Sequence, residues 1–287
     1  MKPSTILVSF FSSSASATGI LLPLYYYPDH NTQAWQPVYD AVGNHSDVPW
    51  LVVINPGNGP GGTFQPGNND SNYIKGMAEL NSHLNVHTIG YVRTNNGRSP
   101  IEEVKANITA WNNWQQYPKA DIWPRGIFFD EAMELHNAPS NVPYITEVVK
   151  FARDQFSVPI TTICNFAAKP AAEYYAICDV VIAFESCLTK HINSTVCSHA
   201  PNYEDRATLD VVVPDKTFRN RSSILIHEFT GSTIGDTVAD ENLLKTMIKS
   251  LKEYDIGWGF FTGKGWEHGN TFTPATIGNV AKFMATV

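Results

Sequence analysis

Eight short apolar runs, rich in β-branched and aromatic residues, are spread along the 287 residues of the chain. Successive runs start roughly 22 to 43 residues apart, which suits repeated units of a strand, a crossover helix and a further parallel strand. Their nearly continuous apolar character is typical of strands that helices cover on the outside. The runs are Gly19–Tyr26, Trp50–Asn55, Val86–Tyr91, Gly126–Asp130, Val158–Asn165, Val180–Glu185, Ser223–Glu228 and Ile256–Thr262.

The segments between these runs favour helices. Apolar residues recur at helical spacing from Ile145 to Phe156, and a comparable stripe runs from Leu243 to Tyr254. Eight strands that alternate with helices in a chain of this length predict an α/β fold of the (β/α)₈ TIM-barrel type, with a single domain. The sixth connection, residues 186–221, has little periodicity and is expected to form a long loop over the mouth of the barrel.

The first 17 residues have the pattern of a signal peptide, and a disordered leader is the alternative. Lys2 supplies a positive start, residues 6–11 are apolar, and Ala15-Ser16-Ala17 fits a cleavage site of small residues. The barrel domain is therefore expected to span residues 18–287. Secretion, to the extracellular space or the cell wall, follows from this interpretation.

Five N-x-S/T sequons support the same compartment, although a chain rich in Asn and Ser makes several expected by chance. The candidate glycosylation sites are Asn44, Asn69, Asn107, Asn193 and Asn220.

All four cysteines lie between residues 164 and 197. A zinc site would usually show two cysteines separated by two to four residues, which this chain lacks. We expect disulfides rather than a metal site or free thiols. Four cysteines allow three pairings, of which we prefer Cys164 with Cys178 and Cys187 with Cys197.

The charge of the chain excludes some partners. A net charge of −7 without a sizeable basic cluster argues against nucleic acid as the partner. The chain contains no run of 18 apolar residues, so no membrane span is predicted.

The glycine-rich segment 56–62 lacks the lysine of a phosphate-binding loop, so we expect its backbone to approach a sugar closely instead. We expect a monomer that needs no cofactor and no metal.

In a (β/α)₈ barrel the active site lies at the carboxyl ends of the strands. Asp130 and Glu131 follow the fourth run, and Glu185 ends the sixth without a nearby Lys or Arg. Two carboxylates that face one another across a pocket are what glycosidic bond hydrolysis requires. We therefore take these three residues as candidate catalytic groups. The alternative for Asp130 is a cap of the following helix.

Other polar and aromatic residues stand at the same predicted strand ends. Aromatic rings there could pack on sugars, although at least half of them are expected to fill the core. Tyr25, Tyr27 and Trp266 belong to this aromatic group, and the alternative for His227 is a buried core histidine. The candidate substrate-binding residues are Tyr26, Asp29, Asn55, Tyr91, Arg93, Asn165, His227, Glu228 and Trp258.

Several of these segments, in this order, resemble the spherulin-4 family. The matching motifs are Gly19–Tyr25, Ile54–Gly61, Gly90–Thr94, Gly126–Glu131 and Phe184–Glu185. The resemblance implies a (β/α)₈ glycoside hydrolase. Fungal members cleave α-1,4-linked N-acetylgalactosamine stretches of galactosaminogalactan, a cell-wall and biofilm polysaccharide. The family's catalytic carboxylates follow the fourth and sixth strands.

The resemblance therefore implies a secreted, endo-acting glycoside hydrolase of this specificity, expected to retain the anomeric configuration. By analogy with other barrel α-glycosidases, Asp130 is expected to act as nucleophile, Glu185 as general acid and base, and Glu131 to orient them or bind substrate; a permutation of these roles is the alternative. The chain departs from the family after the fifth strand, where Asn165-Phe166-Ala167-Ala168 replaces an Asn-Pro-Gly pattern. This departure leaves open a hydrolase of another α-linked polysaccharide. A non-catalytic glycan-binding or spore-wall protein on the same barrel is the other alternative.

Overall fold

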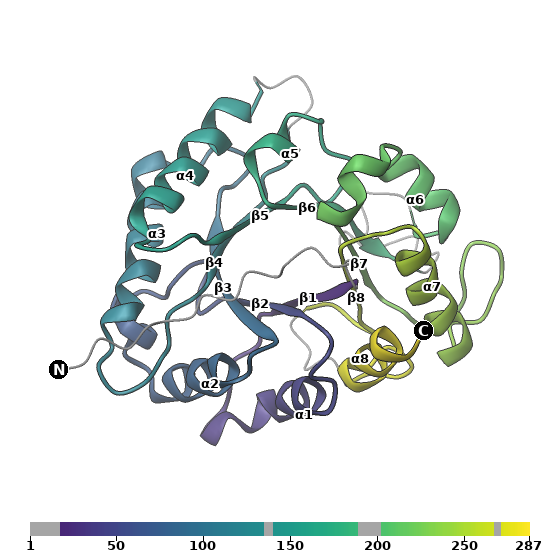
Figure 1. Cartoon of the computed structure of the whole chain (residues 1–287), viewed down its shortest axis with the longest axis horizontal. Coiled ribbons are helices and arrows are strands. Elements are labelled where there is room, and N and C mark those ends of the chain that lie inside the picture. The colour runs from purple at the N-terminus through teal and green to yellow at the C-terminus, as the bar shows by residue number, and fades with distance from the viewer. Residues whose placement is uncertain (1–17, 135–139, 189–201, 267–270) are drawn as a thin grey trace.

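The computed structural model describes residues 18–134, 140–188, 202–266 and 271–287. Eight parallel strands form a closed barrel in chain order, with β1 paired to β8 (Figure 1). This confirms the predicted (β/α)₈ fold with one domain. The strands are β1 Gly19–Leu24, β2 Trp50–Ile54, β3 Val86–Arg93, β4 Gly126–Asp130, β5 Thr161–Asn165, β6 Val180–Cys187, β7 Ser222–His227 and β8 Trp258–Phe261.

Helices form a ring around the strands, and α1 and α8 meet where the ring closes (Figure 1). Each longer helix turns an apolar stripe to the sheet; in α7, Leu244, Met247, Ile248 and Leu251 are buried. The α-helices are α1 Gln36–Asn44, α2 Ser71–Ser82, α3 Ile101–Asn113, α4 Val142–Gln155, α5 Tyr174–Ile177, α6 Arg206–Val212, α7 Glu241–Glu253 and α8 Ile277–Thr286. Short 3₁₀ helices are η1 His30–Trp35, η2 Pro66–Asn69, η3 Trp114–Gln116 and η5 Lys216–Arg221.

Some predicted element bounds were wrong. The sixth connection is not one long loop, because α6 and η5 lie within it, although residues 189–201 are outside the described part of the chain. The fifth strand begins at Thr161 rather than Val158, since its ladder to β4 starts where Thr161 pairs with Gly126. The β3 and β6 strands run two residues further toward the mouth than expected. Those two extensions carry Arg93 and Cys187.

A glycine in β3 allows α3 to pack directly on the strand. A Cβ atom at Gly90 would lie 2.6 Å from the ring of Trp111, which is closer than real Cβ contacts. The indole N–H of Trp111 donates to the backbone oxygen of Tyr91 at 2.8 Å. The helix thereby fixes the backbone of the residue whose side chain enters the site described below.

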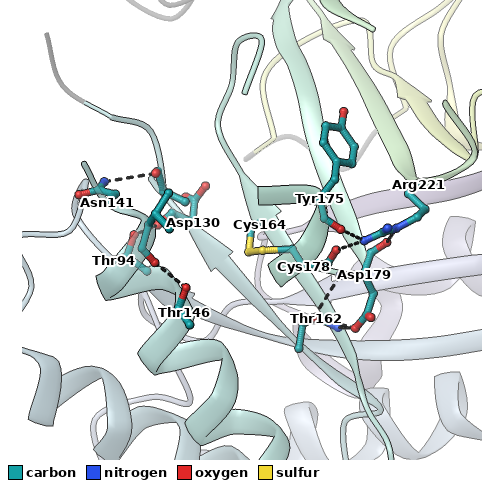
Figure 2. The surroundings of a disulfide bond; sticks show 12 residues. Thr94, Asp130, Asn141, Thr146, Thr162, Cys164, Tyr175, Cys178, Asp179 and Arg221 are labelled. Carbon is teal, nitrogen blue, oxygen red and sulfur yellow. Dashed lines mark hydrogen bonds between the residues drawn. A yellow bond between two sulfur atoms is a disulfide. The ribbon is translucent and has the colours of Figure 1, made fainter. Parts of the chain in front are cut away.

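The predicted disulfide between Cys164 and Cys178 is present (Figure 2). It links β5 to the residue two positions before β6, and both cysteines are fully buried. Next to it, Asp179 accepts hydrogen bonds from the backbone and hydroxyl of Thr162 at 2.8 and 2.7 Å. The second predicted pair includes Cys197, which lies outside the described residues, so that pairing stays a prediction.

Three of the five candidate glycosylation sites, Asn44, Asn69 and Asn220, are exposed. Asn107 is half-buried on α3, where its side chain lies beside Gly59. Asn193 and the predicted leader, residues 1–17, lie outside the described residues. None of the helices in the described ranges is long and apolar enough to cross a bilayer.

Replacing both cysteines, as in Cys164→Ala/Cys178→Ala, should lower the free energy of unfolding by about 3 kcal/mol, because the bridge closes a loop with a sequence separation of 14. Urea unfolding of the oxidised wild type and the double variant measures this difference. The wild type treated with reductant under native conditions is the control and should stay folded, because the bridge is buried. An unchanged midpoint in the double variant would contradict a stabilising role.

Candidate active site

Two carboxylates at the mouth of the barrel share one hydrogen-bond donor. Asn165, the last residue of β5, donates from Nδ2 to Oδ1 of Asp130 at 2.7 Å and to Oε2 of Glu185 at 2.6 Å. The two oxygens therefore lie at most about 5.3 Å apart, since both contact one nitrogen within hydrogen-bond distance. Asn165, expected from the sequence to bind substrate, in fact holds the two carboxylates together.

A β-bulge in β6 turns Glu185 toward this pair. Ile182 pairs with Asn165 on β5, and the register between β6 and β7 shifts between Ile182 and Phe184. Side chains alternate along a regular strand, so Glu185 would face away from Ile182 without that shift. The extra residue reverses the alternation, so that Phe184 packs against Tyr203 while Glu185 reaches Asn165.

Each of the remaining carboxylate oxygens has its own donor. The hydroxyl of Tyr91, on β3, donates to Oδ2 of Asp130 at 2.5 Å. The indole N–H of Trp266, in the connection after β8, donates to Oε1 of Glu185 at 2.8 Å. The Trp266 ring meets His227 edge-on, with centroids 5.4 Å apart. Side chains from β3, β5 and the β8 connection thus fix both carboxylates in place.

Burial and mutual repulsion push the carboxyl groups toward protonation. Burial raises the pKa of Glu185 to about 7, and the neighbouring charge of Asp130 adds to this effect against the hydrogen bonds from Asn165 and Trp266. Burial also raises the pKa of Asp130, while hydrogen bonds from Tyr91 and Asn165 oppose the rise. Two like charges this close do not readily ionise together, so the pair can keep one proton near neutral pH.

Glu131 lies apart from this pair. It has a φ of 52°, and its side chain turns to the rim, where Arg93 Nε donates to Oε1 at 2.9 Å. These side chains are 44% exposed for Arg93 and 35% for Glu131. The interpretation of Asp130 as a helix cap is wrong, because α4 begins at Val142 with Asn141 as its N-cap.

Two predicted substrate-binding residues are placed where they cannot serve. The hydroxyl of Tyr26 is fully buried without a partner and lies near Tyr39 of α1, because side chains alternate beyond the end of β1. Trp258 begins β8 and pairs with Gly19 at the start of β1, which is the opposite end of the barrel from the carboxylates. The prediction that both line the mouth is wrong.

The other predicted binding residues follow strands at the correct end. Asp29 is exposed and accepts a hydrogen bond from the backbone of His30 at 2.7 Å. Asn55 follows β2, and half-buried Glu228 follows β7; neither contacts the two carboxylates within the described ranges. His227 is 1% exposed, with Nδ1 3.4 Å from Sγ of Cys187, which fits the alternative of a core histidine.

Sequence analysis placed Tyr25 and Trp266 only in the group of aromatic residues near the predicted strand ends, without a specific role. The Tyr25 ring meets the Tyr91 ring edge-on, with centroids 5.5 Å apart, and feels the charges of Asp130 and Glu185. Strict alternation from the buried run of β1 could have separated Tyr25 from Tyr26. No sequence signal ties Trp266 to Glu185, because the two are 81 residues apart.

The sequence matches the model of spherulation-specific family 4 over residues 19–283. The chain belongs to this family. Among solved structures, it is similar to Sph3 of Aspergillus clavatus, crystallised in complex with GalNAc. The TM-score is 0.75 and the identity 26%, over 94% of this chain and 98% of Sph3. No curated protein sequence matches the chain.

More distant structures share the fold alone. A chitinase from Bacteroides thetaiotaomicron aligns with a TM-score of 0.57 and 11% identity, over 93% of this chain and 96% of the chitinase. YKL-39, solved with chitooligosaccharides, aligns with a TM-score of 0.56 and 9% identity, over 93% of this chain and 100% of YKL-39. The matched family and the similarity to Sph3, crystallised with GalNAc, place the chain among glycoside hydrolase-like, carbohydrate-active proteins.

The raised pKa of Glu185 has a consequence for stability. The folded protein binds the proton of this carboxyl more tightly than the unfolded chain, so stability should fall as pH rises from about 4.5 through 7. Glu185→Gln has no carboxyl to titrate, so the variant should not lose this stability as pH rises. The difference in free energy of unfolding, variant minus wild type, should therefore be larger at pH 8 than at pH 4.5 by roughly 2 kcal/mol.

Urea unfolding at both pH values measures this change. Glu131→Gln is the matched control, because it removes a carboxylate of equal charge at the exposed rim. A constant difference between Glu185→Gln and wild type at both pH values would show that Glu185 is not held protonated by its surroundings.

Proposed function

We propose that this protein is a secreted, endo-acting glycoside hydrolase that cleaves α-1,4-linked N-acetylgalactosamine regions of galactosaminogalactan-type polysaccharide. The observation that carries the proposal is the Asn165 amide, which holds Asp130 and Glu185 together at the mouth of a (β/α)₈ barrel. Paired carboxylates at this separation are the working parts of a glycosidase.

The environments of the two groups support distinct roles. Asp130 accepts hydrogen bonds from Tyr91, from Asn165 and from the backbone of Glu131, all of which favour its ionised form. A charged carboxylate is suited to attack the anomeric carbon. Glu185, whose pKa burial raises to about 7, is suited to protonate the leaving oxygen and then to activate water. Asp130 is therefore the nucleophile and Glu185 the general acid and base.

The separation of the two carboxylates supports retention of configuration. Retaining enzymes hold their two carboxyl groups about 5 to 5.5 Å apart, whereas inverting enzymes leave 6.5 Å or more for a water molecule. The two oxygens that Asn165 contacts lie at most about 5.3 Å apart, which fits the shorter separation better than the longer one. Glu131 and Arg93, paired at the rim, bind or orient the substrate.

The substrate class rests on the family and on stereochemistry. Sph3, similar to this chain over nearly its whole length, was crystallised with GalNAc. In an α-linked N-acetylhexosamine the 2-acetamido group is cis to the leaving oxygen, so it cannot attack from the opposite face. A carboxylate of the enzyme must supply the nucleophile, which is the role proposed for Asp130. The buried Cys164–Cys178 disulfide supports an extracellular location for such an enzyme.

Incubation with purified galactosaminogalactan tests the proposal. Wild type should release oligosaccharides, whereas Asp130→Asn and Glu185→Gln should lower kcat by at least about 100-fold, because each removes a group that acts on the glycosidic bond. The amide in Glu185→Gln has the size of the carboxylate and can still accept from Asn165 or Trp266 through its one oxygen, so folding should be preserved. The first product, followed by NMR, should carry the α configuration.

Three results would contradict the proposal in different ways. Equal release by wild type and Glu185→Gln would remove Glu185 from the mechanism. A β-configured first product would reject retention. Tight binding of the polymer without any release would favour a glycan-binding protein on the same barrel, and release from another α-linked polysaccharide alone would correct the substrate.

A further inference from the structure

Nearly all of the hydrogen-bond donors described around the carboxylate pair already bond to acceptors of the protein. The two N–H groups of Asn165 reach Asp130 and Glu185, and its carbonyl accepts the backbone N–H of Ala167 at 2.9 Å. The hydroxyl of Tyr91 and the indole N–H of Trp266 are likewise occupied. A sugar that enters this pocket finds these groups already engaged.

Tyr25 differs from its neighbours in this respect. Within the described ranges its hydroxyl makes no hydrogen bond, and it is not sealed from solvent. The hydroxyl of this half-buried side chain is therefore free to bond a ligand. Its ring contacts that of Tyr91, whose hydroxyl donates to Asp130, so Tyr25 lies beside the carboxylate pair.

The ring of Tyr25 is held in one position. It packs edge-on against Tyr91 at an interplanar angle of 85°, and Tyr91 in turn stacks on Phe128 with centroids 5.7 Å apart. Burial and the nearby carboxylates raise the pKa of Tyr25 well above its usual value, so the phenol keeps its proton. A rigid, neutral donor is suited to an oxygen that can only accept.

The chemistry of the sugar decides which oxygen that is. Sugar hydroxyls can donate to carboxylate oxygens, so they do not need a separate protein donor. The carbonyl oxygen of a 2-acetamido group accepts hydrogen bonds only, and an unpaired carbonyl in a closed site costs free energy. This group therefore needs a donor that the carboxylates cannot provide.

We propose that the Tyr25 hydroxyl donates a hydrogen bond to the acetamido carbonyl of the sugar held between Asp130 and Glu185, and thereby selects N-acetylated over non-acetylated sugars. The proposal deepens the proposed hydrolase function and rests on it for the location of that sugar. It assigns Tyr25 to substrate binding, not to proton transfer.

The test compares Tyr25→Phe with Tyr26→Phe in the full chain. Tyr26 is the matched control, because its hydroxyl is buried away from the pocket. On an α-1,4-linked N-acetylgalactosamine oligomer, Tyr25→Phe should lower kcat/KM by roughly 10- to 100-fold, and Tyr26→Phe should leave it within about twofold of wild type. On the chemically de-N-acetylated oligomer, wild type and Tyr25→Phe should be equal.

The pH profile adds a readout that a structural role would not give. Tyr25→Phe should leave both limbs of the kcat/KM profile in place, because its hydroxyl does not bond either carboxylate. Loss of similar size on the acetylated and de-N-acetylated oligomers would overturn the assignment to the acetamido group. Unchanged kcat/KM for Tyr25→Phe on the acetylated oligomer would overturn any contact with substrate.

A binding measurement separates failure of this proposal from failure of the hydrolase function. If wild type cleaves neither oligomer, titration with N-acetylgalactosamine and with galactose, followed by NMR, replaces the kinetic assay. Tyr25→Phe should then bind N-acetylgalactosamine at least about 10-fold more weakly than wild type and Tyr26→Phe, with no change for galactose. Equal affinities of the three proteins for N-acetylgalactosamine would reject the role of Tyr25.

Discussion

A single side-chain amide organises the mouth of this barrel. Asn165 places one donor nitrogen between Asp130 and Glu185, so two carboxylates that would otherwise repel one another are held close together. The position of that amide depends on β5. Cys164, the residue before Asn165, links this strand to the segment that leads into β6 through its disulfide with Cys178 (Figure 2). The covalent and hydrogen-bonded frame of the barrel thus sets the spacing of its reactive groups.

The balance of charge at the pair follows from that spacing. Burial and proximity favour protonation of both groups, and hydrogen-bond donors favour ionisation. Asp130 receives more of those donors than Glu185, so hydrogen bonding favours the ionised form of Asp130 more than that of Glu185. Such asymmetry suits the pair to the distinct roles proposed above for Asp130 and Glu185.

Much of this could be predicted from sequence. Eight apolar runs at the spacing of strand-and-helix units predicted the barrel, because a strand must bury both faces to read as a continuous apolar segment. The fold rule then located Asp130, Glu131 and Glu185 at one mouth. The fold rule could not tell which of the three carboxylates lie together. Glu131 turns to Arg93 at the rim because its backbone is left-handed, and a glutamate in the sequence does not indicate that conformation.

The sequence by itself determined the architecture and which strands end in carboxylates, since both follow from patterns along the chain. Only the tertiary structure decided which of those side chains meet. One extra residue in β6 reverses the period of two and brings Glu185 to Asn165, and the same alternation buries the Tyr26 hydroxyl while Tyr25 faces the pocket. A bulge, and a contact across 81 residues such as that between Trp266 and Glu185, arise from packing between distant segments, which no local pattern records.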